Sequence, residues 1–309
     1  MNDSTSATMM SDTTAPGATR PPSANTGAVE AGNVGHPVVS RERWIAERKV
    51  LLAREKELMR IGDQIARDRR ALPWVRIDKR YVFETPGGRR SLAELFEGRR
   101  QLLVQHFMFA PGWEQGCPSC SFMADHLDGM NVHLAHRDVT LVVVSRATLA
   151  EIERFRRRMG WSFAWASSHG SDFNHDFGVS FTPEEQARGK VDYNYETQPF
   201  PMEEAPGISV FWRGDAGDVF HTWSTYGRGV EVMMGTYHLL DLVPKGRDER
   251  EVSHKMEWVR HHDRYEPEPR AAGSATGAAC CSAHAAADTV VASGTPIAAP
   301  SCSPPRRAR

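Results

Sequence analysis

Two cysteines separated by two residues give the clearest chemical signal in the sequence, Cys117-Pro118-Ser119-Cys120. On one helix this spacing puts both sulfur atoms on the same face, close enough to form a disulfide. Free backbone N–H groups and the helix dipole favour an anion at a helix start, so we expect a lowered pKa for the Cys117 thiol. Pro118 fits the first helical position, where its missing N–H costs nothing. The pattern predicts that Cys117 attacks as a thiolate and that Cys120, further in and more buried, resolves the mixed disulfide.

Zinc binding is the main alternative for the same cysteines. Cys117 and Cys120 are followed by His133 and His136, a spacing close to that of a zinc finger. The gap of two residues between the histidines is shorter than the usual three to five. A finger is also self-contained, whereas these residues lie between two long apolar stretches. Redox chemistry is therefore favoured, with zinc binding and inert buried cysteines left open.

The elements that must position the cysteines follow an alternating order of strands and helices. Residues 102–109 are typical of a buried strand that ends in the loop to Cys117. His106 within it is predicted to be a hydrogen-bonded core residue and not a base. The nearly continuous apolar run 139–144 is typical of a central strand covered on both faces. The order predicts an α/β sandwich with a central mixed sheet, helices on both faces and an antiparallel edge.

The remaining elements are predicted from turn and capping signals. Ser91 and Glu94 form a capping box that opens a short helix. The other predicted segments are strands 81–83, 163–166, 208–212 and 219–223, helices 92–96, 118–134, 149–159 and 230–240, and an irregular insertion at 180–204.

A long helix is predicted before this domain, from a cap at Ser40 to Pro73. Apolar residues recur every seven positions along it, at Trp44, Leu51, Leu58, Ile65 and Leu72. Charged residues three and four positions on make the apolar stripe narrow. A strap across the main domain is favoured, and a dimerisation arm is the alternative.

Composition separates two tails from this ordered part. Residues 1–35 and 267–309 are rich in small and polar residues, and such segments bury too little apolar surface to offset the entropy of ordering. We expect disordered tails there, a helical arm at 36–75 and one domain at 76–266. Cys280, Cys281 and Cys302 fall in the second tail, where no central role is predicted.

Composition also limits the classes of function. The 309 residues carry a formal net charge of −1, which argues against nucleic acid or an anionic membrane as a partner. No apolar run approaches the ~20 residues of a membrane span, and the N-terminus lacks the features of a secretory signal. Five cysteines are too few for a disulfide scaffold, and their number is odd. A cytoplasmic protein with no bound metal and no cofactor beyond the redox-active disulfide is expected.

At this point the residues resemble a known family. Segment 91–96 is similar to the short helix before the core strand of peroxiredoxin-like proteins, and segment 171–179 is similar to their "SD…YGV" segment. Residues 36–265 resemble the thioredoxin-like domain-of-unknown-function family 899 of the redoxin superfamily, often described as predicted dithiol-disulfide oxidoreductases. The segments that carry this resemblance are 36–40, 71–75, 116–121, 220–226 and 235–238. The resemblance implies a thioredoxin-like sandwich.

The resemblance also implies substrate contacts. Thioredoxin-like proteins place a cis-proline opposite the active cysteines, and Pro206 is the candidate by analogy. A cis bond there would expose the Ala205 backbone for pairing with a substrate chain. Trp113, on the loop before Cys117, is a candidate for an apolar substrate groove. The predicted substrate-binding residues are Trp113, Pro118, Ala205 and Pro206.

Three functions remain open at this stage. The leading one is thiol–disulfide exchange on a protein or small-molecule disulfide, with an unknown thiol as reductant. A thiol peroxidase would instead oxidise Cys117 to sulfenic acid, with Cys120 resolving it. The sequence lacks the peroxiredoxin loop Pro-x-x-x-Thr-x-x-Cys, which puts efficient peroxidase chemistry in doubt. A non-catalytic redox-sensing or zinc-binding interaction protein, assembled as a homodimer through the N-terminal helix, is the third.

Overall fold

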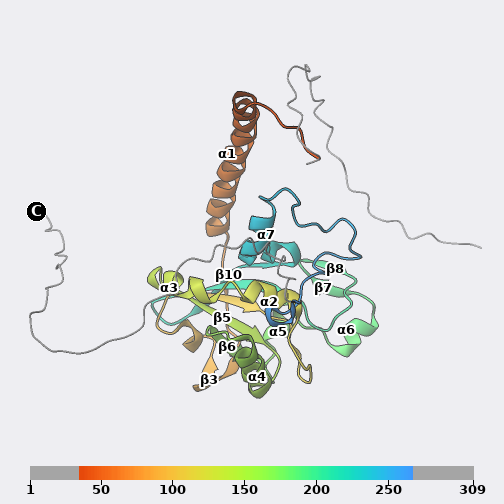
Figure 1. Cartoon of the computed structure of the whole chain (residues 1–309). Coiled ribbons are helices and arrows are strands. Elements are labelled where there is room, and N and C mark those ends of the chain that lie inside the picture. Colours follow the sequence, from red (N-terminus) through yellow and green to blue (C-terminus); the bar gives the residue numbers. More distant parts are fainter. Residues whose placement is uncertain (1–34, 267–309) are drawn as a thin grey trace, which may run out of the picture. The chain divides into compact units, whose positions relative to one another are not determined.

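The computed structural model describes residues 35–266 of the chain. The strands of these residues form one large mixed sheet (Figure 1) and a separate two-stranded hairpin. The strand order in this sheet is β1-β10-β9-β4-β5-β6-β2-β3. Its strands are β1 Val75–Arg76, β2 Val82–Thr85, β3 Gly88–Ser91, β4 Gln101–His106, β5 Val139–Ser145, β6 Ala164–Ser167, β9 Gly207–Arg213 and β10 Val219–Tyr226. A separate hairpin joins β7 Val191–Tyr193 to β8 Glu196–Gln198.

The helices alternate with these strands along the chain. They are α1 Arg41–Ala71, α2 Pro118–Ala124, α3 Asp128–His136, α4 Leu149–Met159, α5 Phe173–Asp176, α6 Pro183–Ala187 and α7 Gly235–Leu240, with 3-10 helices η1 Glu94–Phe96, η2 Gly227–Met233 and η3 His262–Arg264. Strands β4, β5 and β6 run parallel, whereas β9 and β10 add on antiparallel beside β4. This parallel core with an antiparallel edge confirms the predicted architecture.

Strand β5 shows why both faces of the sheet are covered. Leu141 and Val143 belong to one buried cluster, together with residues of α2 and α4. Val142 and Val144 point the other way, into a second cluster that includes residues of η1 and α5. Because successive side chains of a strand alternate between faces, the continuous apolar run serves both clusters. The domain is therefore a thioredoxin-like sandwich with its core on both sides of one sheet.

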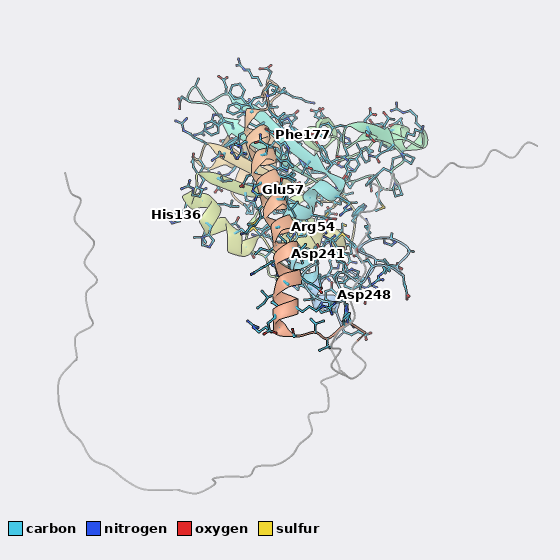
Figure 2. The ribbon with its side chains drawn as sticks, turned by 90° about the horizontal axis from the view of Figure 1, so that it is seen from above. Arg54, Glu57, His136, Phe177, Asp241 and Asp248 are labelled. Atoms are coloured by element: carbon cyan, nitrogen blue, oxygen red, sulfur yellow. The ribbon has the colours of Figure 1, made fainter. Side chains whose placement is uncertain are left out.

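Helix α1 begins where the sequence predicts, because the Ser40 hydroxyl accepts a hydrogen bond from the Arg43 N–H. None of its residues is buried. Charged side chains cover much of the helix, including Arg54 and Glu57, which Figure 2 labels on this ribbon. A strap would bury one face of the helix against the domain, so that interpretation is wrong.

The single helix predicted for 118–134 is two helices instead. They separate after Ala124 because two acidic side chains at the junction are held by distant residues. Asp125 accepts a hydrogen bond from the Trp161 indole at 2.8 Å, and Asp128 accepts from the Ser162 N–H at 2.9 Å. These bonds redirect the chain between the two helices.

Three further segments differ from their predictions. The last helix is interrupted at Met234, so it consists of η2 followed by α7. The capping box at Ser91 opens only a 3-10 turn, although Glu94 does accept from the Ser91 N–H and hydroxyl, each at 2.7 Å. The insertion 180–204 is not irregular: it holds α6, with its own capping box at Thr182, and the β7–β8 hairpin.

Candidate active site

The two motif cysteines lie at the start of α2, after the loop that follows β4. Cys117 is the N-cap residue of this helix and Pro118 occupies the first turn, as predicted. The Cys117 N–H donates to the Met108 carbonyl at 3.0 Å, which ties the motif to the chain just beyond β4. Both cysteines are free, with Cys117 partly exposed and Cys120 only 1% exposed.

The two thiols titrate differently because one donates a hydrogen bond to the other. The Cys120 thiol and then the N–H groups of Cys120 and Ser119 lower the pKa of Cys117 to about 7, against the opposing effect of burial. The pKa of Cys120 is raised, since it donates to Cys117 and is itself buried. This is the division predicted from the sequence, with one thiol partly ionised near neutral pH and the other held protonated.

The residues around the motif leave little freedom to the loop. Gly116 packs so closely on Phe107 that an added Cβ would meet its Cε1 atom at 2.4 Å. The Nε2 of His261 donates to the Gly116 carbonyl at 2.9 Å, and His261 is almost fully buried. Behind the helix, the Gln105 amide donates to the Cys120 carbonyl at 3.4 Å.

Residues near the end of the described chain form further hydrogen bonds around the loop that carries Cys117. Arg158 on α4 makes two hydrogen bonds of 2.8 Å to Asp263 and a third, of 3.0 Å, to Gln115. The His262 ring bonds Asp125, the residue that follows α2, at 2.6 Å. None of these partners was identified from the sequence, because a histidine 145 positions from its acceptor forms no local motif.

Trp113 lies on the loop before Cys117 and is joined to a second loop. Its indole N–H donates to Glu203 at 3.0 Å. Arg146, which follows β5, forms ion pairs with both Glu203 and Glu204. The loop before Cys117 and the loop before β9 are therefore linked through one carboxylate.

The β4–β9 register explains how Ala205 and Pro206 come to this region. It pairs His106 with Gly207, so the residues before Gly207 run beside the chain that continues from β4 to Met108. The Ala205 N–H donates to the Val179 carbonyl at 2.9 Å, and the Pro206 carbonyl accepts from the Tyr193 hydroxyl at 2.8 Å.

The predicted cis bond at Pro206 is wrong. No peptide bond between residues 35 and 266 is cis. Before proline, the trans isomer is more stable than the cis isomer by only a small free energy. The backbone contacts of the neighbouring residues therefore decide which isomer forms. Ala205 is also buried, and its N–H is already bonded within the chain. Pro118, by contrast, is exposed next to Cys117.

Glu204, in the segment before β9, is a buried carboxyl that no pattern in the sequence predicts. Its side chain is 1% exposed, paired with Arg146 and bonded by the Ser180 hydroxyl at 2.8 Å. Burial raises its pKa to about 7, although Arg146 and Ser180 oppose the shift. A carboxyl that changes charge near neutral pH is typical of functional sites. No spacing in the sequence marks it, because its partners lie 58 and 24 positions away.

The buried histidine of β4 belongs to the opposite face. His106 Nε2 and the Ser209 hydroxyl are 2.7 Å apart, and 2.7 Å bonds continue from Ser209 to Ser224 and from Ser224 to His221. His106 also stacks on Phe177, which Figure 2 labels. The structure thus places His106 and His221 in a polar chain of the second core cluster, away from the motif.

The two cysteines and two histidines with zinc-finger spacing do not come together in a metal site. His133 and His136 are exposed on α3, and Figure 2 shows His136 at the outside of that helix. Within the described part of the chain, no group of three or more histidine, cysteine or acidic residues is placed to hold a metal ion. Cys280, Cys281 and Cys302 lie outside the described residues. No helix of residues 35–266 is long and apolar enough to cross a membrane.

The sandwich with a dithiol motif after its first parallel strand defines a thioredoxin-like class. The chain belongs to the family described as "Bacterial protein of unknown function (DUF899)", whose model matches residues 33–265. No curated protein sequence matches it.

Several solved structures have a distant likeness to this chain. The bacterioferritin comigratory protein of Xanthomonas campestris, described for its alkyl peroxide reduction activity, has a TM-score of 0.33 and 11% identity, over 50% of this chain and 88% of that chain. Peroxidoxin BcpB of Mycobacterium tuberculosis has a TM-score of 0.31 and 14% identity, over 53% and 93%. A putative thiol:disulfide interchange protein DsbE of Chlorobium tepidum has a TM-score of 0.33 and 11% identity, over 53% of this chain and 97% of that chain. Similarity at these levels assigns no activity.

Proposed function

We propose that this protein is a thiol–disulfide oxidoreductase whose reactive pair is Cys117 and Cys120. The observation that carries the proposal is the arrangement of the two thiols. Cys117 is partly exposed at the start of α2 with a pKa lowered to about 7, and the buried Cys120 thiol donates to its sulfur. A thiol that is partly ionised near neutral pH combines a useful thiolate fraction with good nucleophilicity.

The proposed reaction transfers two electrons to a substrate disulfide. The Cys117 thiolate attacks one substrate sulfur, which forms a mixed disulfide and releases the other sulfur as a thiolate. Cys120 then attacks Cys117, the bond from Cys117 to the substrate breaks, and the second substrate thiol leaves. The protein ends with a Cys117–Cys120 disulfide, and an external thiol must reduce it for another cycle.

The surface beside Cys117 supports access for such a substrate. Pro118 is exposed, Trp113 is partly exposed, and Glu203 is 42% exposed where it accepts from the Trp113 indole. We expect Trp113, Pro118 and Pro206 to contact the substrate, with Ala205 beside Pro206 in the chain. The proposal requires no metal ion and no cofactor beyond the disulfide itself, and it takes the cytoplasm as the compartment.

The test is reduction of a protein disulfide by the full chain with a thiol reductant. Cys117→Ser should abolish the activity, Cys120→Ser should accumulate a mixed disulfide at Cys117, and Cys302→Ser serves as the matched control with full activity. Mass spectrometry of the oxidised protein should identify a bond between Cys117 and Cys120. Full activity in Cys117→Ser would refute the proposal. Peroxide consumption with sulfenic acid at Cys117, and no disulfide reduction, would favour the peroxidase alternative instead.

We further propose that α1 mediates a homodimer, since it leaves Leu51, Leu58 and Ile65 exposed. Apolar rows on an unburied helix are typical of association surfaces. Sedimentation should show a dimer that Leu58→Glu dissociates and that the matched exposed change Lys56→Glu leaves intact. A monomer in the unaltered chain would exclude this assembly.

A further inference from the structure

The sheet has a gap between β2 and β6. Among the described residues these two strands form a single antiparallel pair, Glu84 with Ser167. Beyond Glu84 the chain of β2 enters the turn at Pro86, which has no N–H to donate to a neighbouring strand. Residues 164–166 of β6 pair with β5 on one side, but on the side of β2 they have no strand partner in the described chain.

This gap contains a cavity of about 210 Å³, far more than the roughly 10–15 Å³ that one water molecule needs. Residues of β2, β6 and α4 line it, and Figure 1 shows β3, β6 and α4 at the same end of the domain. Its apolar lining includes four residues that are almost fully buried, Leu95, Val142, Trp165 and Ala166. Neither motif cysteine lines the cavity, so it is separate from the dithiol.

Arg90 places a positive charge at this cavity. It pairs with Phe83 in the β2–β3 ladder and is one of the lining residues. Its Nη2 atom lies 3.3 Å from the position that a Cβ of Gly87 would take, so the guanidinium lies against the turn. No ion pair joins Arg90 to a carboxylate among residues 35–266. Its charge is therefore available to an anionic ligand.

The other charged groups of the lining already have partners of opposite charge. Arg156 of α4 forms an ion pair with Glu153 at 3.1 Å. Glu97 forms an ion pair with Arg99 at 3.6 Å. Because these pairs offset their own charges, Arg90 determines which charge the cavity prefers. An anionic group is favoured there over a cationic or a neutral one.

We propose that this cavity binds a small carboxylic acid with an apolar body, held as its carboxylate by Arg90. The planar guanidinium matches a carboxylate through two parallel hydrogen bonds. The apolar body lies against Trp165 and Val142, where removal of its surface from water favours binding. A small inorganic anion leaves this apolar lining in contact with water, so the apolar body is part of the proposal. The site goes beyond the proposed redox function and does not depend on it.

Titration of the full chain with three small probes tests this site. Hexanoate has both the carboxylate and the apolar body, whereas hexanol lacks the charge and acetate lacks the apolar body. The indole N–H signal of Trp165, at the cavity wall, reports binding by NMR. Hexanoate should shift this signal to saturation below about 10 mM. Hexanol and acetate should each bind roughly tenfold more weakly, or worse, since each loses one of the two contributions.

Two arginine variants separate the guanidinium contact from a general effect of surface charge. Arg90→Gln should weaken hexanoate binding by roughly tenfold or more and leave hexanol binding unchanged, because only the carboxylate contacts the guanidinium. Arg89→Gln is the matched control. Arg89 precedes Arg90 on β3, is exposed, pairs with Glu84 and does not line the cavity, so this change should leave hexanoate binding intact.

Several outcomes would overturn the proposal. They are an unshifted Trp165 signal with hexanoate up to about 10 mM, an equal affinity for hexanoate and either other probe, and an equal loss in the two arginine variants. The comparison of probes uses the unaltered chain, so it decides the question even if a variant fails to fold. Loss of disulfide reduction in Cys117→Ser bears only on the proposed function, because neither motif cysteine takes part in this site.

Discussion

The imidazole of His261 donates a 2.9 Å hydrogen bond to the carbonyl of Gly116, the residue before Cys117. The ring is buried and packs edge-on against Phe155 of α4, with centroids 5.3 Å apart. A residue from the end of the described chain thus fixes the loop that carries the reactive thiol. Buried carbonyls without a partner are costly, so this bond stabilises one position of the loop.

Replacing His261 tests whether its hydrogen bond to Gly116 stabilises the loop. His261→Ala should destabilise the fold by about 1–3 kcal/mol, since it leaves the Gly116 carbonyl unpaired. It should also slow the reaction of Cys117 with a disulfide, because the loop is no longer held. Urea unfolding and the rate of the first thiol exchange measure the two effects. His254→Ala, at an exposed site bonded only to its neighbour Ser253, is the control. Equal stability of the two variants would show that the bond contributes nothing.

Gly116 offers a steric test of the same loop. Gly116→Ala would bring a Cβ to 2.4 Å from the Phe107 ring and 3.0 Å from the Phe155 ring, both in the packed core. We expect a loss of about 1–3 kcal/mol in unfolding free energy and slower formation of the Cys117–Cys120 disulfide.

The matched control is Gly129→Ala on the exposed surface of α3, where nothing lies within 4 Å of the added Cβ. It should be neutral or stabilising by about 0.5–1 kcal/mol, since alanine favours a helix over glycine. If Gly116→Ala proved as stable as this control, the close packing on Phe107 would not matter.

The pKa of Cys117 depends first on the Cys120 thiol as a hydrogen-bond donor. Cys120→Ala removes the donor, so the pH midpoint of Cys117 alkylation should move up from about 7 toward that of an ordinary thiol. Cys120→Ser keeps a hydroxyl donor and should remain closer to the native midpoint. The rate of iodoacetamide labelling against pH measures both. Identical midpoints in the two variants would mean that the backbone N–H groups of α2 alone set the acidity.

The parts of the fold that the sequence predicts correctly depend on local signals. The apolar run of β5 and the apolar face of α4, with Ile152, Phe155 and Met159 buried, need only their own residues. The position of Cys117 before Pro118 is equally local, because helix starts have a characteristic composition. These local signals therefore predict the motif and the order of strands around it.

Predictions from the sequence are wrong where contacts between residues far apart in the chain determine the local structure. Asp125 ends α2 through bonds to Trp161 and His262, and a pattern of helix-forming residues cannot reveal either partner. His261 lies 141 positions after Cys120, and only folding brings it near the motif. The bond before Pro206 differs between isomers by only about 0.5–1 kcal/mol in an open chain, so analogy to a family was a weak guide.

The pH dependence of stability should carry a contribution from His106. Complete burial lowers its pKa to about 3, and the Nδ1 atom has no hydrogen-bond partner among residues 35–266. An unfolded histidine titrates near 6.5, so the unfolded chain binds the proton more tightly and stability increases with pH in this window. The native contribution is fully present above about pH 6.5 and decreases by up to about 1.4 kcal/mol per pH unit as the pH falls toward 3.

Urea unfolding at several pH values, in the native chain and in His106→Gln, measures this contribution. The variant starts less stable, because it disturbs the bond to Ser209, but its stability should decrease less steeply between about pH 6.5 and 4.5. Carboxylates contribute equally to both proteins, so the difference in slope isolates His106. His136→Gln, at an exposed position on α3, should reproduce the native slope. Equal slopes in the native chain and His106→Gln would mean that the buried ring takes up a proton as readily as it does in the unfolded chain.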